Sequence, residues 1–211
     1  IEESVPANFA AGYPAREQPF TPGSCALISL GNDLTLPTTM TVSAMIWPTK
    51  SGHSEQAVMS FSKRDNPKTW FVLGIDDTGH GFCRILLADG SSAQVTLLTT
   101  LRERTWTRLW AAIDTDTGQL TVGSHNEGRG ESNTTTLEAQ VADNTTGEGE
   151  ILIAATRTEG RSCYFNGKID SPMIYDRYLD QVSLLDEVSD PAEHLFARWD
   201  FSVGMSTTQI H

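Results

Sequence analysis

Residues 106–124, WTRLWAAIDTDTGQLTVGS, open with the longest pure β-strand pattern in the sequence. Leu109, Ala111 and Ile113 alternate with the residues between them, and this period of two places successive side chains on opposite faces of a strand. Residues 114–118, DTDTG, then supply the Asp and Gly that tight hairpin loops use. The stretch ends in a second strand pattern, so it predicts two antiparallel strands joined by a tight turn.

Runs rich in Val, Ile, Thr, Phe and Trp recur on both sides of this hairpin, separated by turn-forming clusters of Gly, Asp, Asn and Pro. Helical patterns do not alternate with these runs, which argues against a parallel α/β fold. We therefore expect an all-β antiparallel sandwich, with a polar surface excursion at residues 125–148. The expected strands are residues 40–48, 57–62, 70–75, 81–87, 93–98, 106–113, 119–124, 151–154 and 163–176.

The composition supports a folded domain with a sizeable core. Hydrophobic residues make up 38% of the 211-residue chain and charged residues 20%, which excludes wholesale disorder. The apolar face of each expected strand supplies the core. The predicted core residues are Val42, Ala44, Ile46, Val58, Phe71, Leu73, Ile85, Leu109, Ala111, Ile113, Leu120, Ile151, Ile153, Ile169 and Ile174.

The charge balance is strongly acidic. Asp and Glu number 27 against 15 Lys and Arg, which gives a formal net charge of −12. Binding to nucleic acid or to an acidic membrane surface requires clustered cations, so neither is expected as a partner. No apolar run approaches the roughly 20 residues that span a bilayer, so membrane insertion is not expected either.

Three regions are expected along the chain. Residues 1–24 are rich in Pro and Gly and predict an extended N-terminal lead-in. Residues 25–180 contain the strand pattern of the domain, and residues 181–211 form a C-terminal extension that begins a connection to missing sequence. Short helical turns are expected near the C-terminus at residues 180–188 and 190–193, where an Asp-Pro pair can start a helix.

The two ends of the sequence indicate a piece of a longer chain. It begins at Ile1 rather than Met, and it stops at His211 without the character of a tail. No basic segment followed by an apolar one occurs near the start, so the signal-peptide pattern is missing and a cytoplasmic location is expected. A localisation signal in the missing parts would change that expectation.

Three cysteines, Cys25, Cys83 and Cys163, are spaced unlike any zinc or redox motif. Three buried thiols in a reducing compartment is the simpler interpretation, because free cysteine is among the most buried residue types. One long-range disulfide is the open alternative.

Patterns typical of catalysis are missing. The sequence has neither a Gly-x-Ser-x-Gly elbow nor the Glu-x-Asp-x-x-Glu strand pattern that aims carboxylates into the groove of laminarinase-type glycanases. The five histidines lie in polar or turn segments, where solvated residues are commoner than members of a catalytic triad. No catalytic residue is therefore predicted, and a hydrolase with an unrecognised site is the least favoured function.

Two candidate binding features remain. Asp114 and Asp116 could offer oxygen ligands to Ca²⁺, but local hydrogen bonding in a tight turn explains the same residues and is preferred. Asp76 and Asp77 receive the same interpretation. Trp70 follows a polar loop, which makes it the best candidate for an exposed aromatic face on which a sugar ring could stack.

Residues 164–180, YFNGKIDSPMIYDRYLD, resemble the closing strand of laminin-G-like, concanavalin-A-like jelly rolls, which commonly read Phe-x-Gly-x-Ile-Asp and then Ile-Tyr-x-Arg-x-Leu. Gly167 permits a bulge or a close approach there. Residues 40–48 resemble the opening strand of that family and residues 106–114 its central Trp-containing strand. The resemblance covers about residues 25–180 and implies an antiparallel two-sheet jelly-roll sandwich, but no particular ligand.

Shorter segments at the flanks resemble the N-terminal region of the large subunit of N,N-dimethylformamidase. They are residues 22–24 (PGS), 47–49 (WPT) and 197–202 (ARWDFS). In that family a lectin-like jelly roll precedes an amidohydrolase part that holds a mononuclear iron through Tyr and Glu residues, and the chain pairs with a small subunit. The resemblance implies that the iron and its ligands belong to missing sequence, so no cofactor other than Ca²⁺ is considered for this fragment.

The leading interpretation is a non-catalytic, lectin-like accessory module of a larger bacterial amidohydrolase, packed against the catalytic part or a partner subunit. The alternative is an independent carbohydrate-binding lectin whose partner is a glycan. A glycan array with and without calcium separates these two functions.

Overall fold

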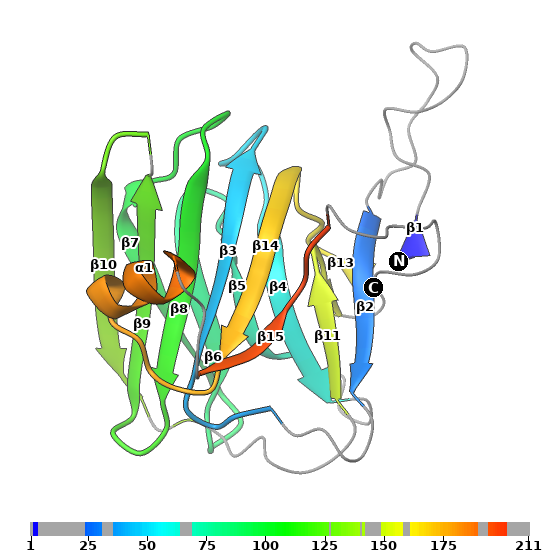
Figure 1. Ribbon diagram of the computed structural model, residues 1–211. Coiled ribbons are helices and arrows are strands. Elements are labelled where there is room, and N and C mark those ends of the chain that lie inside the picture. Colours follow the sequence, from blue (N-terminus) through cyan, green and yellow to red (C-terminus); the bar gives the residue numbers. More distant parts are fainter. Residues whose placement is uncertain are drawn as a thin grey trace.

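The computed structural model describes residues 2–3, 24–30, 36–63, 69–126, 128–139, 141, 149–157, 161–189 and 194–201. Strands occupy most of these residues (Figure 1). In chain order the elements are β1 (Glu2–Glu3), β2 (Ser24–Leu30), β3 (Met40–Pro48), β4 (Gln56–Lys63), β5 (Thr69–Ile75), β6 (His80–Leu86), β7 (Ser92–Thr100), β8 (Thr107–Asp114), β9 (Gln119–Asn126), β10 (Glu131–Glu138), β11 (Gly149–Ile153), β12 (Thr156–Arg157), β13 (Arg161–Ser162), β14 (Gly167–Tyr175), α1 (Gln181–Ser189) and β15 (Leu195–Arg198).

Most strands form two large antiparallel sheets packed face to face, and β12 and β13 pair in a small two-stranded sheet of their own (Figure 1). One sheet has seven strands in the order β1-β2-β11-β4-β5-β6-β7, and the other has six in the order β10-β9-β8-β3-β14-β15. Strands distant in the sequence lie side by side, because β3 pairs with both β8 and β14. The antiparallel two-sheet jelly-roll sandwich expected from the sequence is thereby confirmed.

The main hydrophobic core fills the space between the sheets. Leu109, Ala111 and Ile113 point into it from β8, as their alternation in the sequence predicts. Every predicted core residue belongs to this cluster except Ile169, which is partly buried and packs against it. The period-two pattern therefore identified the inward face of each strand correctly.

Helix α1 covers the outer face of the six-stranded sheet. Leu184 of the helix and Leu179 before it pack against Trp110 and Tyr175, and all four side chains are at most 2% exposed. Strand β8 is therefore buried on both of its faces. Gly123 of β9 makes room for the indole, because a Cβ at this position would lie 2.2 Å from Trp110 Cε2.

Segments next to β12 and β13 lie on the outer face of the seven-stranded sheet. Ser60 Oγ donates a hydrogen bond to the Ala155 carbonyl at 2.8 Å, and the Ala57 amide donates to the Cys163 carbonyl at 2.7 Å. Cys163 has a φ of 52°, which interrupts the extended backbone. The strand expected at residues 163–176 consequently starts only at Gly167, in β14.

The surface excursion expected at residues 125–148 contains a strand that the sequence did not indicate. β10 pairs with β9 along its whole length. Residues 134–136 are three threonines, whose β-branched side chains favour extended backbone. β10 lies at the edge of its sheet and is largely exposed, so the apolar alternation that marks an inner strand is missing.

The flanking regions contribute to the same sandwich. α1 confirms the helical turn expected at residues 180–188, whereas residues 190–193 lie outside the described residues, as does most of the lead-in. β1 pairs with β2, and β15 extends the six-stranded sheet beside β14. Among the helical residues described here, no segment has the length and apolar character needed to cross a membrane.

All three cysteines are free thiols. Cys25 and Cys83 are buried and Cys163 is half-buried, so the disulfide alternative is wrong. Burial raises the pKa of the Cys25 and Cys83 thiols, because desolvation disfavours the thiolate. The reducing compartment suggested by free cysteines stays a prediction.

Candidate functional site

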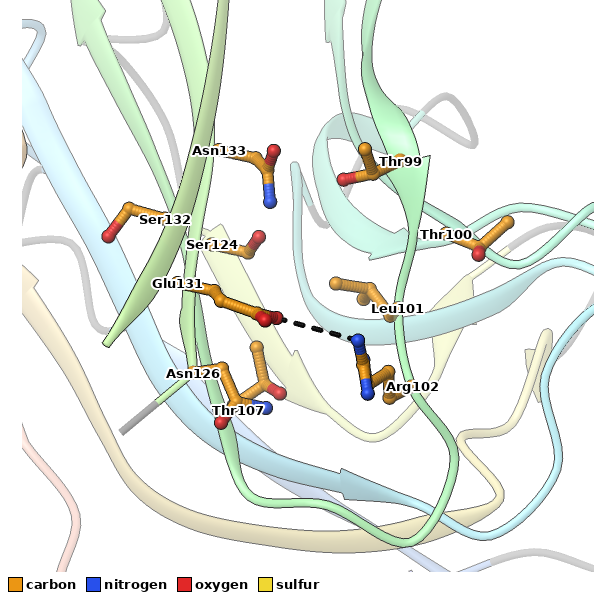
Figure 2. A pocket seen from close by; sticks show the side chains of 10 residues that line it. All are labelled: Thr99, Thr100, Leu101, Arg102, Thr107, Ser124, Asn126, Glu131, Ser132 and Asn133. Carbon is orange, nitrogen blue, oxygen red and sulfur yellow. Dashed lines mark ion pairs between the residues drawn. The ribbon is translucent and has the colours of Figure 1, made fainter. Parts of the chain in front are cut away.

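A pocket of about 520 Å³ opens where the edges of the two sheets come together (Figure 2). β7 is the last strand of the seven-stranded sheet, and β10 is the last strand of the six-stranded sheet. The end of β7 forms one wall, and parts of β8, β9 and β10 form the other. The lining residues are Thr99, Thr100, Leu101, Arg102, Thr107, Ser124, Asn126, Glu131, Ser132 and Asn133.

The pocket has a polar floor made of Thr107, Ser124 and Asn126. Their exposed fractions are 3%, 4% and 7%. Thr107 lies two residues before Leu109 in β8, on the same inward face of the strand. Ser124 and Asn126 likewise lie on the inward face of β9, with Val122. The inward face of these two strands therefore changes from apolar to hydrogen-bonding at the end that borders the pocket.

Asn126 carries a buried acceptor that the described residues do not satisfy. Among them, its Oδ1 has no hydrogen-bond partner, while its backbone carbonyl accepts from the Gly130 amide at 2.8 Å and the Arg129 amide at 3.2 Å. Leaving a buried acceptor unpaired costs roughly 1–3 kcal/mol, so such groups are rare in folded proteins. Because this oxygen is itself shielded from solvent, a ligand hydroxyl or amide would recover that cost only if the floor side chains shift to admit it.

The mouth of the pocket is crossed by an ion pair. Arg102 Nη2 lies 3.7 Å from Glu131 Oε2, and Figure 2 shows the two side chains reaching toward each other from opposite walls. Arg129 Nη1 lies 4.0 Å from the other carboxylate oxygen. All three side chains are about half exposed (51–55%), so solvent screens these pairs and they contribute little to stability.

Ser132 belongs to the pocket wall mainly through its backbone position. Its side chain points away from the cavity in Figure 2 and bonds to His125 Nδ1 at 2.7 Å on the other face of the sheet. This bond joins β9 to β10 behind the wall. It therefore supports the strands that hold Asn126 and Glu131.

Trp70 is buried, and its expected exposure was wrong. It is 3% exposed and stacks on Phe61, with ring centroids 6.5 Å apart and an interplanar angle of 17°. The pairing of β4 with β5 shifts register between Phe61 and Ser62, and both Trp70 and Phe71 belong to the main core. Burial of a large indole outweighs the polar loop that precedes it. Buried in this way, Trp70 offers no face to a sugar ring.

Trp106 is an exposed indole that the sequence assigned to a strand. It is 38% exposed and directly precedes Thr107 of the pocket floor. Trp106 lies just before β8 and is not among the residues that line the pocket.

Asp114 is used by its own turn. Its Oδ1 accepts hydrogen bonds from the amides of Asp116 at 3.0 Å and Thr117 at 3.3 Å. Hydrogen bonds from Thr117, foremost from its side chain, lower the pKa of Asp114. Within the described residues no group of three or more His, Cys, Asp or Glu could hold a metal ion. The preferred hairpin interpretation accounts for these contacts, and calcium binding stays a prediction.

Asp76 likewise closes a turn. Its Oδ1 accepts from the amide and hydroxyl of Thr78, at 2.9 and 2.7 Å, and from the amide of His80 at 2.9 Å. Desolvation acts to raise the pKa of Asp76, but these donors outweigh it and the pKa is lowered.

The family follows from a sequence comparison that agrees with this architecture. A laminin G-type family model, described as the concanavalin A-like lectin/glucanases superfamily, matches residues 23–183. The chain belongs to the concanavalin A-like lectin/glucanase superfamily. No curated protein sequence matches this superfamily member.

Several solved structures of other proteins have a sandwich fold similar to that of this domain. The enzymatically active domain of bacteriophage CBA120 tailspike protein 2 is 14% identical, with a TM-score of 0.62, and the match covers 85% of this chain and 29% of that chain. The CBM40 of Ruminococcus gnavus IT-sialidase, bound to α2,3-sialyllactose, is 20% identical, with a TM-score of 0.58 and coverage of 72% and 82%. The LG1–3 region of the laminin α2 chain is 14% identical, with a TM-score of 0.57 and coverage of 75% and 31%.

These likenesses establish the fold alone. The match corresponds to only 24% of the full-length tailspike protein 2, so this superfamily member spans a fraction of that chain. None of the comparisons bears on the resemblance to N,N-dimethylformamidase. The pocket floor was missed at the sequence level because Thr107, Ser124 and Asn126 come from two strands and meet only in the folded sheet.

Proposed function

We propose that this domain is a non-catalytic carbohydrate-binding module whose ligand enters the pocket between the edges of the two sheets. The observation that carries the proposal is the polar floor, in which Thr107, Ser124 and Asn126 are buried and Asn126 Oδ1 is unpaired. Hydroxyl and amide groups both donate and accept hydrogen bonds, which suits the many hydroxyls of a sugar. The volume of about 520 Å³ lies within the usual range for small-ligand sites.

The chemistry of the lining favours binding over hydrolysis. Glycoside hydrolysis generally uses two carboxyl groups on opposite sides of the scissile bond. Glu131 is the sole carboxylate among the ten lining residues, and it lies beside Arg102 and Arg129. Membership in a superfamily of lectins and glucanases and the fold shared with a sialyllactose-bound CBM40 support a carbohydrate ligand.

The parent enzyme is a separate proposal that rests on the sequence resemblance alone. In it, the module packs against the catalytic part or partner subunit of an N,N-dimethylformamidase-like amidohydrolase. Reading the coding sequence beyond His211 tests this. A continuing frame with Tyr and Glu iron ligands supports it, and an immediate stop codon rejects it.

A glycan array followed by titration tests carbohydrate binding. We expect the 211-residue chain to bind at least one glycan. The Asn126→Ala variant should weaken that binding about tenfold or more, the effect of losing a buried hydrogen bond of about 1.4 kcal/mol. Val182→Ala is the matched control, because Val182 is 68% exposed on α1 and does not line the pocket.

Two results would contradict the proposal. One is an array without hits, both with and without calcium. The other is a glycan that binds Asn126→Ala, shown to be folded by its thermal transition, as tightly as the wild type. Release of reducing sugar from a bound glycan would overturn the non-catalytic part.

A further inference from the structure

The charge around the pocket is opposite in sign to that of the protein. The chain carries a net charge of −12, yet the segments that flank the pocket are basic. Of the four arginines in residues 101–108 and 128–132, Arg102 lines the pocket and Arg129 lies beside Glu131, whereas Arg108 is buried and contacts Ser43 Oγ. A local excess of cations in an acidic protein creates a region of positive potential that attracts anions.

Glu103 is held outside the pocket. Its Oε1 accepts hydrogen bonds from the amide of Ser51 at 2.7 Å and from the hydroxyl of Ser51 at 3.3 Å. Donation from the Ser51 amide is the main cause that lowers the pKa of Glu103. The carboxylate is therefore engaged with the loop between β3 and β4, and among the described residues Glu131 is the carboxylate that pairs with Arg102 and Arg129.

Arg102 and Arg129 share that one carboxylate. The distances of 3.7 and 4.0 Å are longer than the roughly 2.7–2.9 Å of a close charge-assisted hydrogen bond. Both guanidinium groups are half exposed and retain donors that face solvent. Within the part of the chain that the structure describes, Arg102 and Glu131 line the mouth and Arg129 lies beside Glu131, above a floor of uncharged hydrogen-bonding groups.

We propose that the pocket selects a sugar that bears a carboxylate. The carboxylate binds Arg102 at the mouth and is attracted by Arg129 beside it, and the sugar hydroxyls bond to the polar floor of Thr107, Ser124 and Asn126. A carboxylate is favoured as the anionic group because its two oxygens match the planar fork of a guanidinium. Glu131 then competes with the ligand for the two arginines. This inference rests on the proposed carbohydrate-binding function and names its ligand class.

Because Glu131 competes with an acidic ligand, the direction in which Glu131→Gln changes the binding affinity distinguishes acidic from neutral ligands. If the ligand is acidic, Glu131→Gln removes a competing anion and strengthens binding. If the ligand is neutral and its hydroxyls donate to Glu131, the same substitution weakens binding. Glu138→Gln at the other end of β10 is the matched control, because it changes the net charge equally but lies outside the pocket lining.

The probes are pairs of sugars that differ only in their acid group. Methyl β-D-glucuronide is compared with methyl β-D-glucoside, methyl β-D-galacturonide with methyl β-D-galactoside, and the methyl glycoside of N-acetylneuraminic acid with its methyl ester. Binding is followed by NMR titration of the folded chain. We expect the acid of at least one pair to bind about tenfold more tightly, with about threefold further gain in Glu131→Gln, no gain in Glu138→Gln, and about tenfold loss in Arg102→Gln.

Each outcome decides the inference. Equal binding of acid and neutral partners, or weaker acid binding by Glu131→Gln, overturns the acidic-sugar ligand. If neutral sugars still bind and Asn126→Ala abolishes that binding, the carbohydrate-binding function stands without it. If no sugar of either kind binds, here or on the array, the proposed function fails and the inference fails with it.

Discussion

Adding one methyl group at Gly123 should destabilise the sandwich more than any comparable change on its surface. A Cβ at this position would lie 2.2, 2.3 and 2.5 Å from three atoms of the Trp110 indole. The indole is 1% exposed and packs in one cluster with Leu184 of α1, Leu179 and Tyr175. Overpacking of a core typically costs about 1–3 kcal/mol, and three contacts this short place Gly123→Ala at about 3 kcal/mol or more.

Urea unfolding measures that cost. With a denaturant slope of about 2 kcal/mol per molar, a loss of 3 kcal/mol lowers the urea midpoint by about 1.5 M. Two other glycines separate steric clash from backbone strain. Gly128→Ala meets no atom closer than 3.6 Å and should change stability by less than about 0.5 kcal/mol. Gly130→Ala has open space but a φ of +65°, so it should cost about 1–2 kcal/mol through backbone strain alone.

A double-mutant cycle identifies Trp110 as the clashing partner. Trp110→Phe removes the atoms that the new methyl group would meet, so the double variant should be more stable than the sum of the two single losses by at least ~1 kcal/mol. The reasoning is refuted if Gly123→Ala costs less than 1 kcal/mol. It is also refuted if the two substitutions are additive within error.

Three further predictions concern the helix, an acidic turn and the thiols. Leu184→Ala should cost about 2–5 kcal/mol in urea unfolding because Leu184 is fully buried on the inner side of α1, whereas Val182→Ala on the exposed side should be nearly neutral. The pKa of Asp76 is lowered in the folded state, so its contribution to stability is present above about pH 4 and is lost as the pH falls through the folded pKa. Asp76→Asn should therefore be less stable than the wild type at pH 7, and the gap in urea midpoint should close toward pH 2; a constant gap would contradict this. In native protein treated with iodoacetamide, mass spectrometry should find Cys163 alkylated before Cys83, because Cys83 is fully buried and burial raises the pKa of its thiol.

The sequence contained enough information for the fold because burial follows the alternation of side chains along each strand. Leu109, Ala111 and Ile113 point into the core as predicted, and so do the corresponding residues of β3 and β11. The edge strand β10 escaped prediction because an edge strand can satisfy its geometry with Thr and charged residues. Trp70 was misplaced because the pairing of β4 with β5 skips Trp70 between Phe71 and Thr69, and single-strand periodicity does not contain such irregularities.

The candidate site could not be predicted from local patterns. Thr107 and Asn126 are 19 positions apart, and each looks like an ordinary polar residue near a strand end. They become a floor only because β8 and β9 pair in a register that brings the ends of both strands to the same edge. The basic character of residues 101–108 was visible in the sequence, but its meaning depends on the wall that β10 supplies.

The covering of the outer faces has a consequence for the shape of any ligand. α1 lies on one sheet, and the segments next to β12 and β13 lie on the other, so parts of both broad faces are already occupied (Figure 1). The pocket of about 520 Å³ at the sheet edges has the size of a small-ligand site rather than of a groove along a whole sheet face. If the domain has the proposed function, it would then bind the terminal unit of a glycan and not the sugars within the chain. The number of binding sites on a polysaccharide would then equal its number of chain ends. Cutting the polysaccharide into shorter chains at constant mass would therefore increase the amount of domain that it binds.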